Sequence, residues 1–404
     1  MWSFLKKSKF VVYIMIFIFV LFFTLDFGAV DLQKVAIVVT LGLDYETASD
    51  EYILSGQIAT TDSGNSFTAS ENQAVIYGTG KTPSMALKNM EDNSGWHPYI
   101  NFCKLIILSK SVFENDIINS LDFFLRTERL NDTALICATE TKAADILNSK
   151  TSLDEVSTFS LLKTLLYNGS QNMNIVATNL KNFAIRYYNS SSGNILTYIK
   201  MNEEIKTAAA DGDENAGDEE EESKPTIFNP TMAAVFRKDE FAGFLSAEDV
   251  RAYNLVTKKI KLGQIDINDI EVEGYHINSC SVEIERSKCK KSVFFDNNNI
   301  VCNLNVCLNF KIDHLESEEK NLDFLLNSED IPKELTEVLK EKIKQDIKNM
   351  IAIIKSYDAD IFDIEETLFK YQPNIYRTFK QQNGDFSFIQ NTYFNININA
   401  NAIT

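Results

Sequence analysis

The residues best suited to chemistry in this 404-residue chain are six cysteines and three histidines. Thiolates close in sequence can bind zinc or form disulfides, and four of the cysteines fall between positions 280 and 307. Cys302 and Cys307 are five residues apart on a predicted strand and point to opposite faces, which excludes a bridge or a shared metal between them. The three histidines lack the spacing of a helical metal site: His97, His276 and His314.

Cys280 and Cys302 are predicted to lie in a core. Cys280 shares one strand face with Val282, and Cys302 shares another with Leu304, so both are interpreted as small buried hydrophobic residues. Because the domain is predicted to be exported, a cross-strand disulfide is the alternative. The two candidate pairs are Cys280–Cys302 and Cys289–Cys307.

Two segments carry residues that could bind phosphate or calcium. The segment Gly78–Thr82 ends in Gly-Lys-Thr like a phosphate-binding loop, but Val75 stands where that loop needs its first glycine. Thr82 is therefore expected to cap a helix that begins at Pro83. In an acidic segment, four residues match calcium-loop positions, but the glycine that turns such a loop is displaced, so a solvated loop is favoured over calcium. They are Asp211, Asp213, Asn215 and Glu222.

A second group of carboxylates follows the longest predicted helix. In a chain with a net charge of −18, they are expected to form a solvated face instead of a general acid–base pair. They are Asp358, Asp360, Asp363, Glu365 and Glu366. The sequence also lacks a Gly-x-Ser-x-Gly nucleophile elbow. We therefore expect no enzyme, no cofactor and no metal, and favour a binding or assembly role.

The first element of the chain is an apolar run from Phe10 to Leu25. Its length lies between that of a signal-peptide core and that of a membrane-spanning helix. Phe27 makes a poor cleavage site before Ala29, so we predict an uncleaved anchor. Its residues are Phe10, Val11, Val12, Tyr13, Ile14, Met15, Ile16, Phe17, Ile18, Phe19, Val20, Leu21, Phe22 and Phe23. By the positive-inside rule, three lysines keep the amino terminus in the cytoplasm and place the rest outside: Lys6, Lys7 and Lys9.

Composition divides the rest of the chain. A content of 45% hydrophobic and 24% charged residues is typical of folded globular protein, and the negative charge argues against nucleic acid as a partner. An acidic stretch without large apolar residues is predicted to be a linker or loop. We predict an anchor over 1–30, an α+β region of one or two subdomains over 31–205, the acidic linker over 206–225 and a second α+β region over 226–404.

Hydrophobic periodicity predicts the elements of the two regions. In the first, strands are expected at 35–41 and 51–60, and capping boxes at Ser111–Glu114 and Ser152–Glu155 predict helices. In the second, Ser246 opens a helix that ends at Gly263. Further strands are expected at 232–236, 240–245, 275–286, 292–295, 300–312 and 393–403, in an antiparallel or mixed sheet. One long amphipathic helix over 332–355 is predicted to cover it with Leu335, Leu339, Ile343, Ile347, Met350, Ile351 and Ile354.

Several short motifs follow one another in a characteristic order. They are Leu41-Gly42-Leu43-Asp44, Tyr77-Gly78-Thr79-Gly80-Lys81-Thr82, Asp122-Phe123-Phe124-Leu125-Arg126, Val235-Phe236-Arg237-Lys238, Phe241-Ala242-Gly243-Phe244-Leu245-Ser246 and Tyr357-Asp358-Ala359-Asp360-Ile361-Phe362. Their order and spacing resemble the spore germination Ger(x)C family, the C subunits of germinant receptors. The resemblance covers nearly the whole chain beyond the anchor.

This resemblance implies a non-enzymatic α+β protein of three domains on the outer face of the inner spore membrane. It also implies assembly with A and B subunits into a receptor for small-molecule germinants. The family normally carries a lipidated cysteine where this chain has Ala29, so no lipidation is expected and the apolar helix would hold the protein alone. The alternative is a stand-alone, membrane-anchored solute-binding or envelope module, which would need a deep pocket lined by aromatic side chains.

Overall fold

The computed structural model describes residues 11–20, 35–59, 74–115, 117–127, 130–149, 157–169, 171–188, 193–203, 226–272, 274–296, 299–317, 333–383 and 387–403. Residues 11–20 are helical, and all ten are exposed. The other predicted anchor residues and the three lysines lie outside the described residues, as do Ala29, the acidic segment and the Ser152–Glu155 capping box. Within the described ranges, no helix combines the length and apolarity needed to cross a bilayer.

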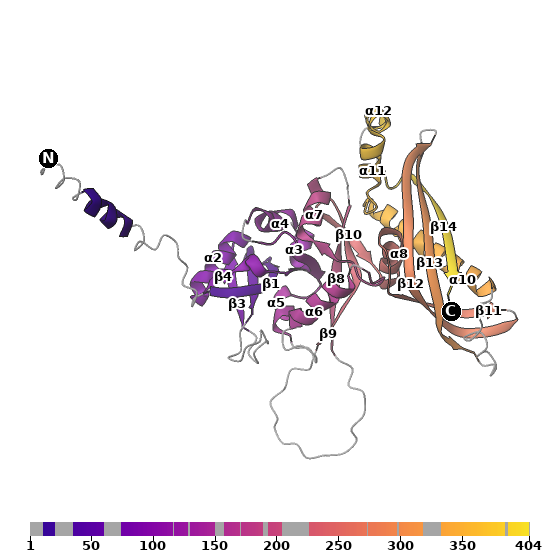
Figure 1. The fold of residues 1–404 in the computed structure, drawn as a ribbon, viewed down its shortest axis with the longest axis horizontal. Helices are drawn as coiled ribbons and strands as arrows, with labels where there is room; N and C mark the ends of the chain where they lie inside the picture. The colour runs from indigo at the N-terminus through magenta and orange to yellow at the C-terminus, as the bar shows by residue number, and fades with distance from the viewer. Residues whose placement is uncertain are drawn as a thin grey trace, which may run out of the picture.

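The described strands form two sheets (Figure 1). The first has the order β10-β9-β8-β6-β5-β1-β2-β3, with β4 paired to β1 and β7 paired to β6. Its central strands β1, β5, β6 and β8 run parallel, and antiparallel strands flank them. The strands are β1 (Val35–Glu46), β2 (Glu51–Ile58), β3 (Val75–Gly80), β4 (His97–Tyr99), β5 (Leu105–Ser109), β6 (Leu135–Thr139), β7 (Thr178–Asn179), β8 (Gly193–Glu203), β9 (Thr226–Arg237) and β10 (Glu240–Leu245).

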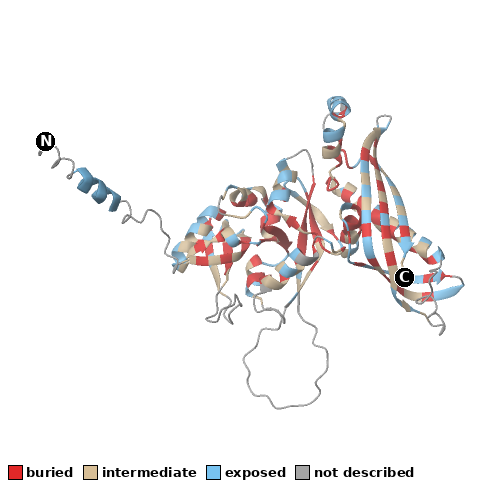
Figure 2. Ribbon diagram, in the orientation of Figure 1, coloured by how far each residue is buried: buried red, intermediate tan, exposed pale blue. Residues whose placement is uncertain are grey.

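Helices cover both faces of the first sheet, and each face has its own apolar cluster. One face packs against α2 (Pro83–Ser94), α3 (Lys110–Asn115), α4 (Ile117–Arg126) and α7 (Leu180–Tyr188). The other packs against α5 (Ala143–Asn148), α6 (Ser157–Lys163) and a short π-helix, Thr164–Asn168. A 3-10 turn, Ile100–Phe102, precedes β5. Because parallel strands are covered on both sides, β5 and β6 are buried at every residue, as Figure 2 shows by the red centre of this half.

The second sheet has the order β11-β12-β13-β14. Strands β11 (Gly263–Val272), β12 (Tyr275–Asp296) and β13 (Asn299–Glu316) are antiparallel, whereas β14 (Thr392–Ala402) runs parallel to β13. Its core also includes α8 (Ala247–Thr257) and α10 (Lys333–Tyr357). Two shorter helices, α11 (Ile364–Tyr371) and α12 (Pro373–Asn383), lie between α10 and β14 in the chain. The mixed α+β class predicted from the sequence is confirmed.

Several local predictions are confirmed. The Thr82 side chain accepts a hydrogen bond from the Met85 N–H and caps α2, with Pro83 as its first residue. Ser246 and Asp249 form a reciprocal capping box at the start of α8. The seven residues predicted to be buried on α10 are its buried residues, and β13 alternates between buried and less buried positions from Ile300 to Phe310.

Three boundaries were wrong. Ser111 lies inside α3, which begins at Lys110, because its hydroxyl accepts a hydrogen bond from the Tyr45 N–H instead of capping the helix. The helix that begins after Ser246 ends at Thr257, and Gly263 opens β11. The predicted break between residues 286 and 292 does not exist, because β12 is continuous over 22 residues.

Strands from both sides of the acidic segment belong to the first sheet. Strands β9 and β10, which follow the acidic segment, pair with β8 and complete the first sheet. The register runs from Gly193 opposite Arg237 to Glu203 opposite Thr226. The segment between Glu203 and Thr226 therefore connects two adjacent strands of one sheet.

Candidate functional site: a polar junction between the two sheets

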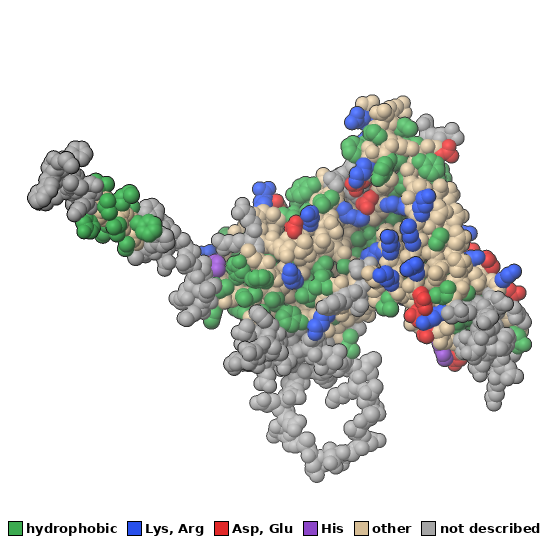
Figure 3. Space-filling view, in the orientation of Figure 1, with side chains coloured by type: hydrophobic (Ala, Val, Ile, Leu, Met, Phe, Trp, Pro, Cys, Tyr) green, Lys and Arg blue, Asp and Glu red, His purple; other side chains and the backbone are tan. Residues whose placement is uncertain are grey.

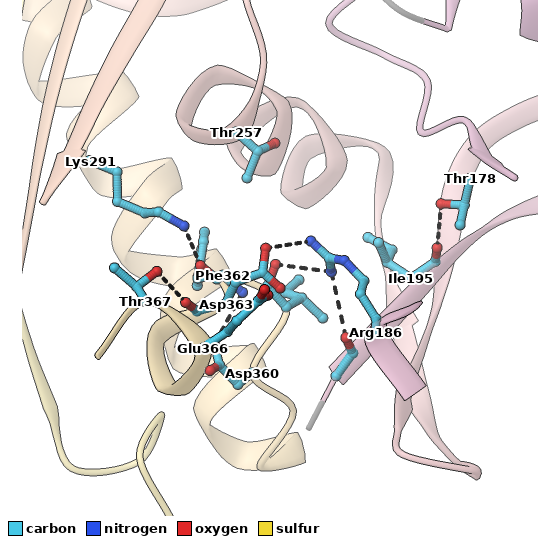
Figure 4. A network of polar contacts seen from close by, with 12 residues as sticks. Thr178, Arg186, Ile195, Thr257, Lys291, Asp360, Phe362, Asp363, Glu366 and Thr367 are labelled. Carbon is cyan, nitrogen blue, oxygen red and sulfur yellow. Dashed lines mark hydrogen bonds and ion pairs between the residues drawn. The ribbon is translucent and has the colours of Figure 1, made fainter. Parts of the chain in front are cut away.

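The segment 357–363, here called the junction segment, begins at the last residue of α10 and contacts both halves of the molecule (Figure 4). Gly193 begins β8 and lies directly against it. A Cβ atom at Gly193 would stand 2.7 Å from the Asp360 carbonyl carbon and 2.8 Å from the Ile361 nitrogen. The first sheet therefore approaches the junction segment backbone to backbone, which only glycine allows at this position.

Arg186 of α7 holds the carboxyl end of the junction segment. Its Nη2 atom lies 2.9 Å from Asp363 Oδ2, and its Nη1 atom donates to the Ile361 carbonyl at 3.3 Å. Burial opposes the charge of this guanidinium, but Tyr253, Asp363 and Asp360 together raise the pKa of Arg186. The ion pair is thus enclosed, and it joins α7 of the first half to the residue that precedes α11.

Two contacts hold the amino end of the junction segment. Asp358 forms an ion pair with Arg237 at the end of β9, with 2.9 Å between Oδ2 and Nη2, and also accepts a hydrogen bond from Ser387. The Tyr357 hydroxyl donates to the Phe244 carbonyl of β10 at 3.1 Å. The ring of Tyr357 occupies the space that a side chain on Gly243 would need. Both contacts tie the end of α10 to the edge of the first sheet.

The centre of the junction segment is buried and polar. Asp360 is fully buried and accepts hydrogen bonds from the Phe362 and Glu365 N–H groups at 3.2 and 2.9 Å. Burial raises the pKa of Asp360 to about 6. Lys291 of β12 donates to the Phe362 carbonyl, and the Phe362 ring packs near that of Phe394 on β14. The second sheet therefore holds the same segment from the opposite side.

The carboxylates after the longest helix do not form a solvated face as predicted. Asp360 and Glu365 are buried. Glu365 accepts hydrogen bonds from the Tyr376 hydroxyl at 2.7 Å and the Lys380 ammonium at 2.9 Å. The amides that bond Asp360 lie two and five residues along the chain, and the partners of Glu365 lie on α12. The burial of these two carboxylates therefore depends on how the segment and α12 pack, and not on local charge density.

The junction uses its polar groups to hold two sheets together. Each carboxylate described above accepts from a named donor, and none of them lines either of the two grooves found on the second half. Among the described residues, no group of three histidine, cysteine or acidic side chains could hold a metal ion. The arrangement joins the two halves through ion pairs, hydrogen bonds and close backbone packing.

The other candidate residues are dispersed. All six cysteines are free: Cys103, Cys137, Cys280 and Cys302 are buried, Cys289 is half-buried and Cys307 is exposed. In the strand register Cys280 faces Leu315 and Cys302 faces Val293, so neither sulfur is opposite another. His97 pairs with Glu91 at 2.9 Å, whereas His276 and His314 are exposed on the second sheet.

The glycines near Lys81 serve packing. A Cβ atom at Gly78 would stand 2.0 Å from the Ala86 carbonyl oxygen, and one at Gly80 would stand 2.7 Å from the Met85 Cβ atom, so β3 packs closely on α2. Lys81 donates to the Ser49 carbonyl at 2.7 Å. This geometry agrees with the prediction of a capped helix in place of a phosphate loop.

The ordered motifs found in the sequence have architectural roles in the fold. Asp44, at the end of the first motif, accepts hydrogen bonds from the Ala143 and Ala144 N–H groups and so caps α5. Asp122 and Arg126 form an ion pair along α4. The fourth and last motifs meet through Arg237 and Asp358. Asp122 and Arg126 are four residues apart on one helix, whereas the partners of Asp44 and Asp358 lie far away in the chain and could not be predicted from the sequence.

Comparisons with known proteins agree with this architecture. Residues 28–201 match the family model described as the spore germination protein N-terminal domain, and residues 231–404 match the spore germination B3/GerAC-like C-terminal domain. A crystal structure of the GerBC protein shares the fold, with a TM-score of 0.53 and 16% identity over 90% of this chain and 97% of GerBC. A search of curated proteins gave no significant match. On the strength of the two domain matches, the chain belongs to the Ger(x)C family of spore germination proteins.

Proposed function

We propose that this chain is a non-enzymatic, membrane-anchored C subunit of a spore germinant receptor. Its folded part lies on the extracytoplasmic side of the inner spore membrane and assembles with A and B subunits that respond to small-molecule germinants. The observation that carries the proposal is the pair of family domains, in order, over residues 28–201 and 231–404. The junction supports it, because a fixed relation between the two halves suits a subunit that contacts partners with both.

The amino-terminal helix supports the anchoring part of the proposal. Residues 11–20 are apolar apart from the Tyr13 hydroxyl, and every one of them is exposed. Exposed apolar side chains around a helix suit a lipid environment better than water. In this proposal the predicted run from Phe10 to Phe23 is the membrane segment, and no lipid is attached at Ala29.

Membrane co-purification tests the subunit role. Tagged full-length protein, extracted from spore membranes with detergent, is expected to bring down a polytopic A-type and a B-type partner. In the variant Phe17→Lys, a charge within the apolar helix costs about 2.5–3.5 kcal/mol of insertion free energy and is expected to reduce membrane retention. Phe17→Leu is the matched control and is expected to stay in the membrane. Recovery of the native chain from the medium, or from membranes without a polytopic partner, would contradict the proposal.

The alternative, a stand-alone solute-binding module, requires a deep aromatic pocket. The two grooves of the second half measure about 670 and 480 Å³. Lysine, asparagine and carboxylate side chains contribute much of their lining, and neither groove is an aromatic cage. The larger groove has a different use, which follows from its position.

A further inference from the structure

The larger groove runs along the open edge of β14. Its lining includes residues from both faces of that strand, such as Asn395 and Ile396, together with α10 residues such as Lys348 and Ile351. Strand β14 ends the second sheet, and in the described part of the chain no strand pairs with its outer side. The groove therefore gives access to the backbone of an edge strand.

Two hydrogen bonds reveal which backbone groups of β14 point outward. The Ile403 N–H donates to the Phe310 carbonyl of β13, whereas the Thr392 carbonyl accepts from Lys355 on the outer side. Neighbouring residues of a strand point their N–H and C=O groups to opposite sides, and the β13–β14 register has no shift. The outward groups therefore belong to Phe394, Ile396, Ile398 and Ala400.

The edge of β14 lacks the features that normally protect an edge strand. Thr392–Ala402 contains no charged residue and no proline. Strand β11, at the other edge of the same sheet, carries Asp266, Asp269 and Glu271. Edge charges and prolines discourage the addition of another strand, so the two edges differ in their capacity to pair.

Side-chain hydrogen bonds to β13 also hold β14 in a fixed position, which favours the addition of another strand. The Asn395 amide donates to Asn303 Oδ1, and the Asn397 amide donates to Asn305 Oδ1, each at 3.0 Å. These side-chain bonds repeat the backbone register on the exposed face of the sheet. A fixed strand costs less entropy on binding than a mobile one.

Positive charge surrounds this edge although the chain as a whole is acidic. Lys344, Lys348 and Lys355 line the groove. On the exposed face of the sheet, β12 adds Arg286, Lys288 and Lys290, and Figure 3 shows Lys and Arg side chains gathered over the region of β12 and β13. Strands lie about 4.8 Å apart, which puts these β12 charges about 14 Å from a strand added at β14. Salt screens most of their effect at that distance, so the groove lysines supply the main attraction.

We propose that β14 binds an extended, acidic segment of a partner protein as an additional strand of the second sheet. Main-chain hydrogen bonds to Phe394, Ile396 and Ile398 would supply the affinity, and carboxylates of the partner would meet the groove lysines. A second copy of this chain fits less well, because two β14 edges would bring the same lysines together. The biological meaning of this surface rests on the proposed subunit role, whereas its capacity to bind a strand does not.

The probe for this proposal is a short peptide that alternates valine with glutamate, added to the full-length protein in detergent. It is expected to bind, and residue-resolved hydrogen exchange is expected to slow at Phe394, Ile396 and Ile398 but not at Asn395 and Asn397, whose amides already face β13. A version with lysine in place of glutamate, and one with N-methylated backbone, are expected to bind much more weakly.

Charge variants test whether peptide binding depends on the lysines of the groove or only on the overall electrostatic attraction between peptide and protein. Lys348→Glu is expected to weaken binding of the glutamate peptide about fivefold or more, while Lys333→Glu, an equal charge change outside the groove, leaves it nearly unchanged. Equal binding of the acidic and basic peptides, equal effects of the two variants, or slowed exchange elsewhere than β14 would overturn the proposal. So would a dimer in analytical ultracentrifugation that is lost on peptide binding. None of these results depends on whether A and B subunits co-purify.

Discussion

Arg186 and Asp363 are 177 residues apart in the chain, yet their side chains form an ion pair of 2.9 Å between α7 and the start of α11. Only about a quarter of either side chain is exposed, at 22% and 28%. Since the same guanidinium also bonds the Ile361 carbonyl, this one contact links the first half of the molecule to the junction segment.

Removing the charge of Asp363 is expected to destabilise the fold. Asn keeps the left-handed backbone that Asp363 adopts at φ 56°, so Asp363→Asn tests the ion pair without added strain. We expect a loss of about 1–3 kcal/mol in the free energy of unfolding, because Arg186 stays partly buried without its counter-ion. Chemical denaturation of the full-length protein in detergent measures it.

The control is Asp122→Asn, which removes the ion pair with Arg126, whose side chain is 80% exposed. That change should cost less than about 0.5 kcal/mol. Similar losses in the two variants would show that the junction ion pair contributes no more than a surface pair.

The buried Asp360 is expected to give the protein a distinctive pH response. Burial raises the pKa of Asp360 from 3.8 to about 6. Between these two pH values the Asp360 carboxyl keeps its proton in the folded state and has lost it in the unfolded state. Its contribution to stability therefore falls as the pH rises from about 4 to about 6. Asp360→Asn removes this titration, and the stability of the variant relative to the native chain is expected to rise across that window and then level off.

Unfolding curves at several pH values check this prediction. The quantity compared is the free energy of unfolding of the variant minus that of the native chain, plotted against pH. Replacing an oxygen acceptor by an amide adds a constant loss, which shifts this difference at every pH and leaves its slope unchanged. Asp239→Asn, at an exposed turn, provides the same change in formal charge. A difference in stability between Asp360→Asn and the native chain that changes with pH no more than that of the control, or that falls as the pH rises, would contradict the assignment.

The close packing at Gly193 leads to a third prediction. In Gly193→Ala the new methyl group would meet the Asp360 and Ile361 backbone at 2.7–2.8 Å, so the sheets must separate. We expect a loss of about 1–3 kcal/mol, measured by thermal or chemical unfolding. Gly56→Ala is the matched control, since a Cβ there meets its nearest neighbour at 3.4 Å. Equal tolerance of both changes would argue against the backbone contact.

Thiol reactivity reports on the second sheet. Maleimide is expected to label Cys307 first in the native protein, because it is the exposed cysteine among the six, and Cys289 more slowly. Burial raises the pKa of Cys103 and of Cys302 to about 12, so both should react only on unfolding. Mass spectrometry locates the labels, and Cys307→Ser should remove the fast phase. Rapid labelling of Cys302, or recovery of a disulfide, would contradict the register of β12 and β13.

Sequence periodicity predicted the elements whose burial pattern is unbroken. Strand β13 alternates strictly from Ile300 to Phe310, and α10 repeats its apolar residues every three or four positions. Both patterns follow directly from strand and helix geometry. Strand β11 escaped prediction because Asp269, at φ 53°, interrupts its alternation and because Gly263 was assigned to a helix end.

The junction could not be predicted from sequence, and the reason is physical. Asp358, Asp360 and Asp363 look like a solvated cluster when only local charge is considered. Arg237 and Arg186 reach Asp358 and Asp363 through the packing of the two halves, whereas the Glu365 amide that meets Asp360 lies in the first turn of α11. Local pattern reports which face of an element is apolar, but it does not report which remote cation meets a carboxylate.

The pairing of β8 with β9 has a consequence for the acidic segment between them. Because both strands belong to one sheet, hydrolysis of a peptide bond between residues 204 and 225 would not release either half. The nicked chain would remain a single particle held by the ladder from Gly193 to Glu203 and by the core beneath it. The length and composition of that segment can therefore change during evolution without altering how the folded parts are joined.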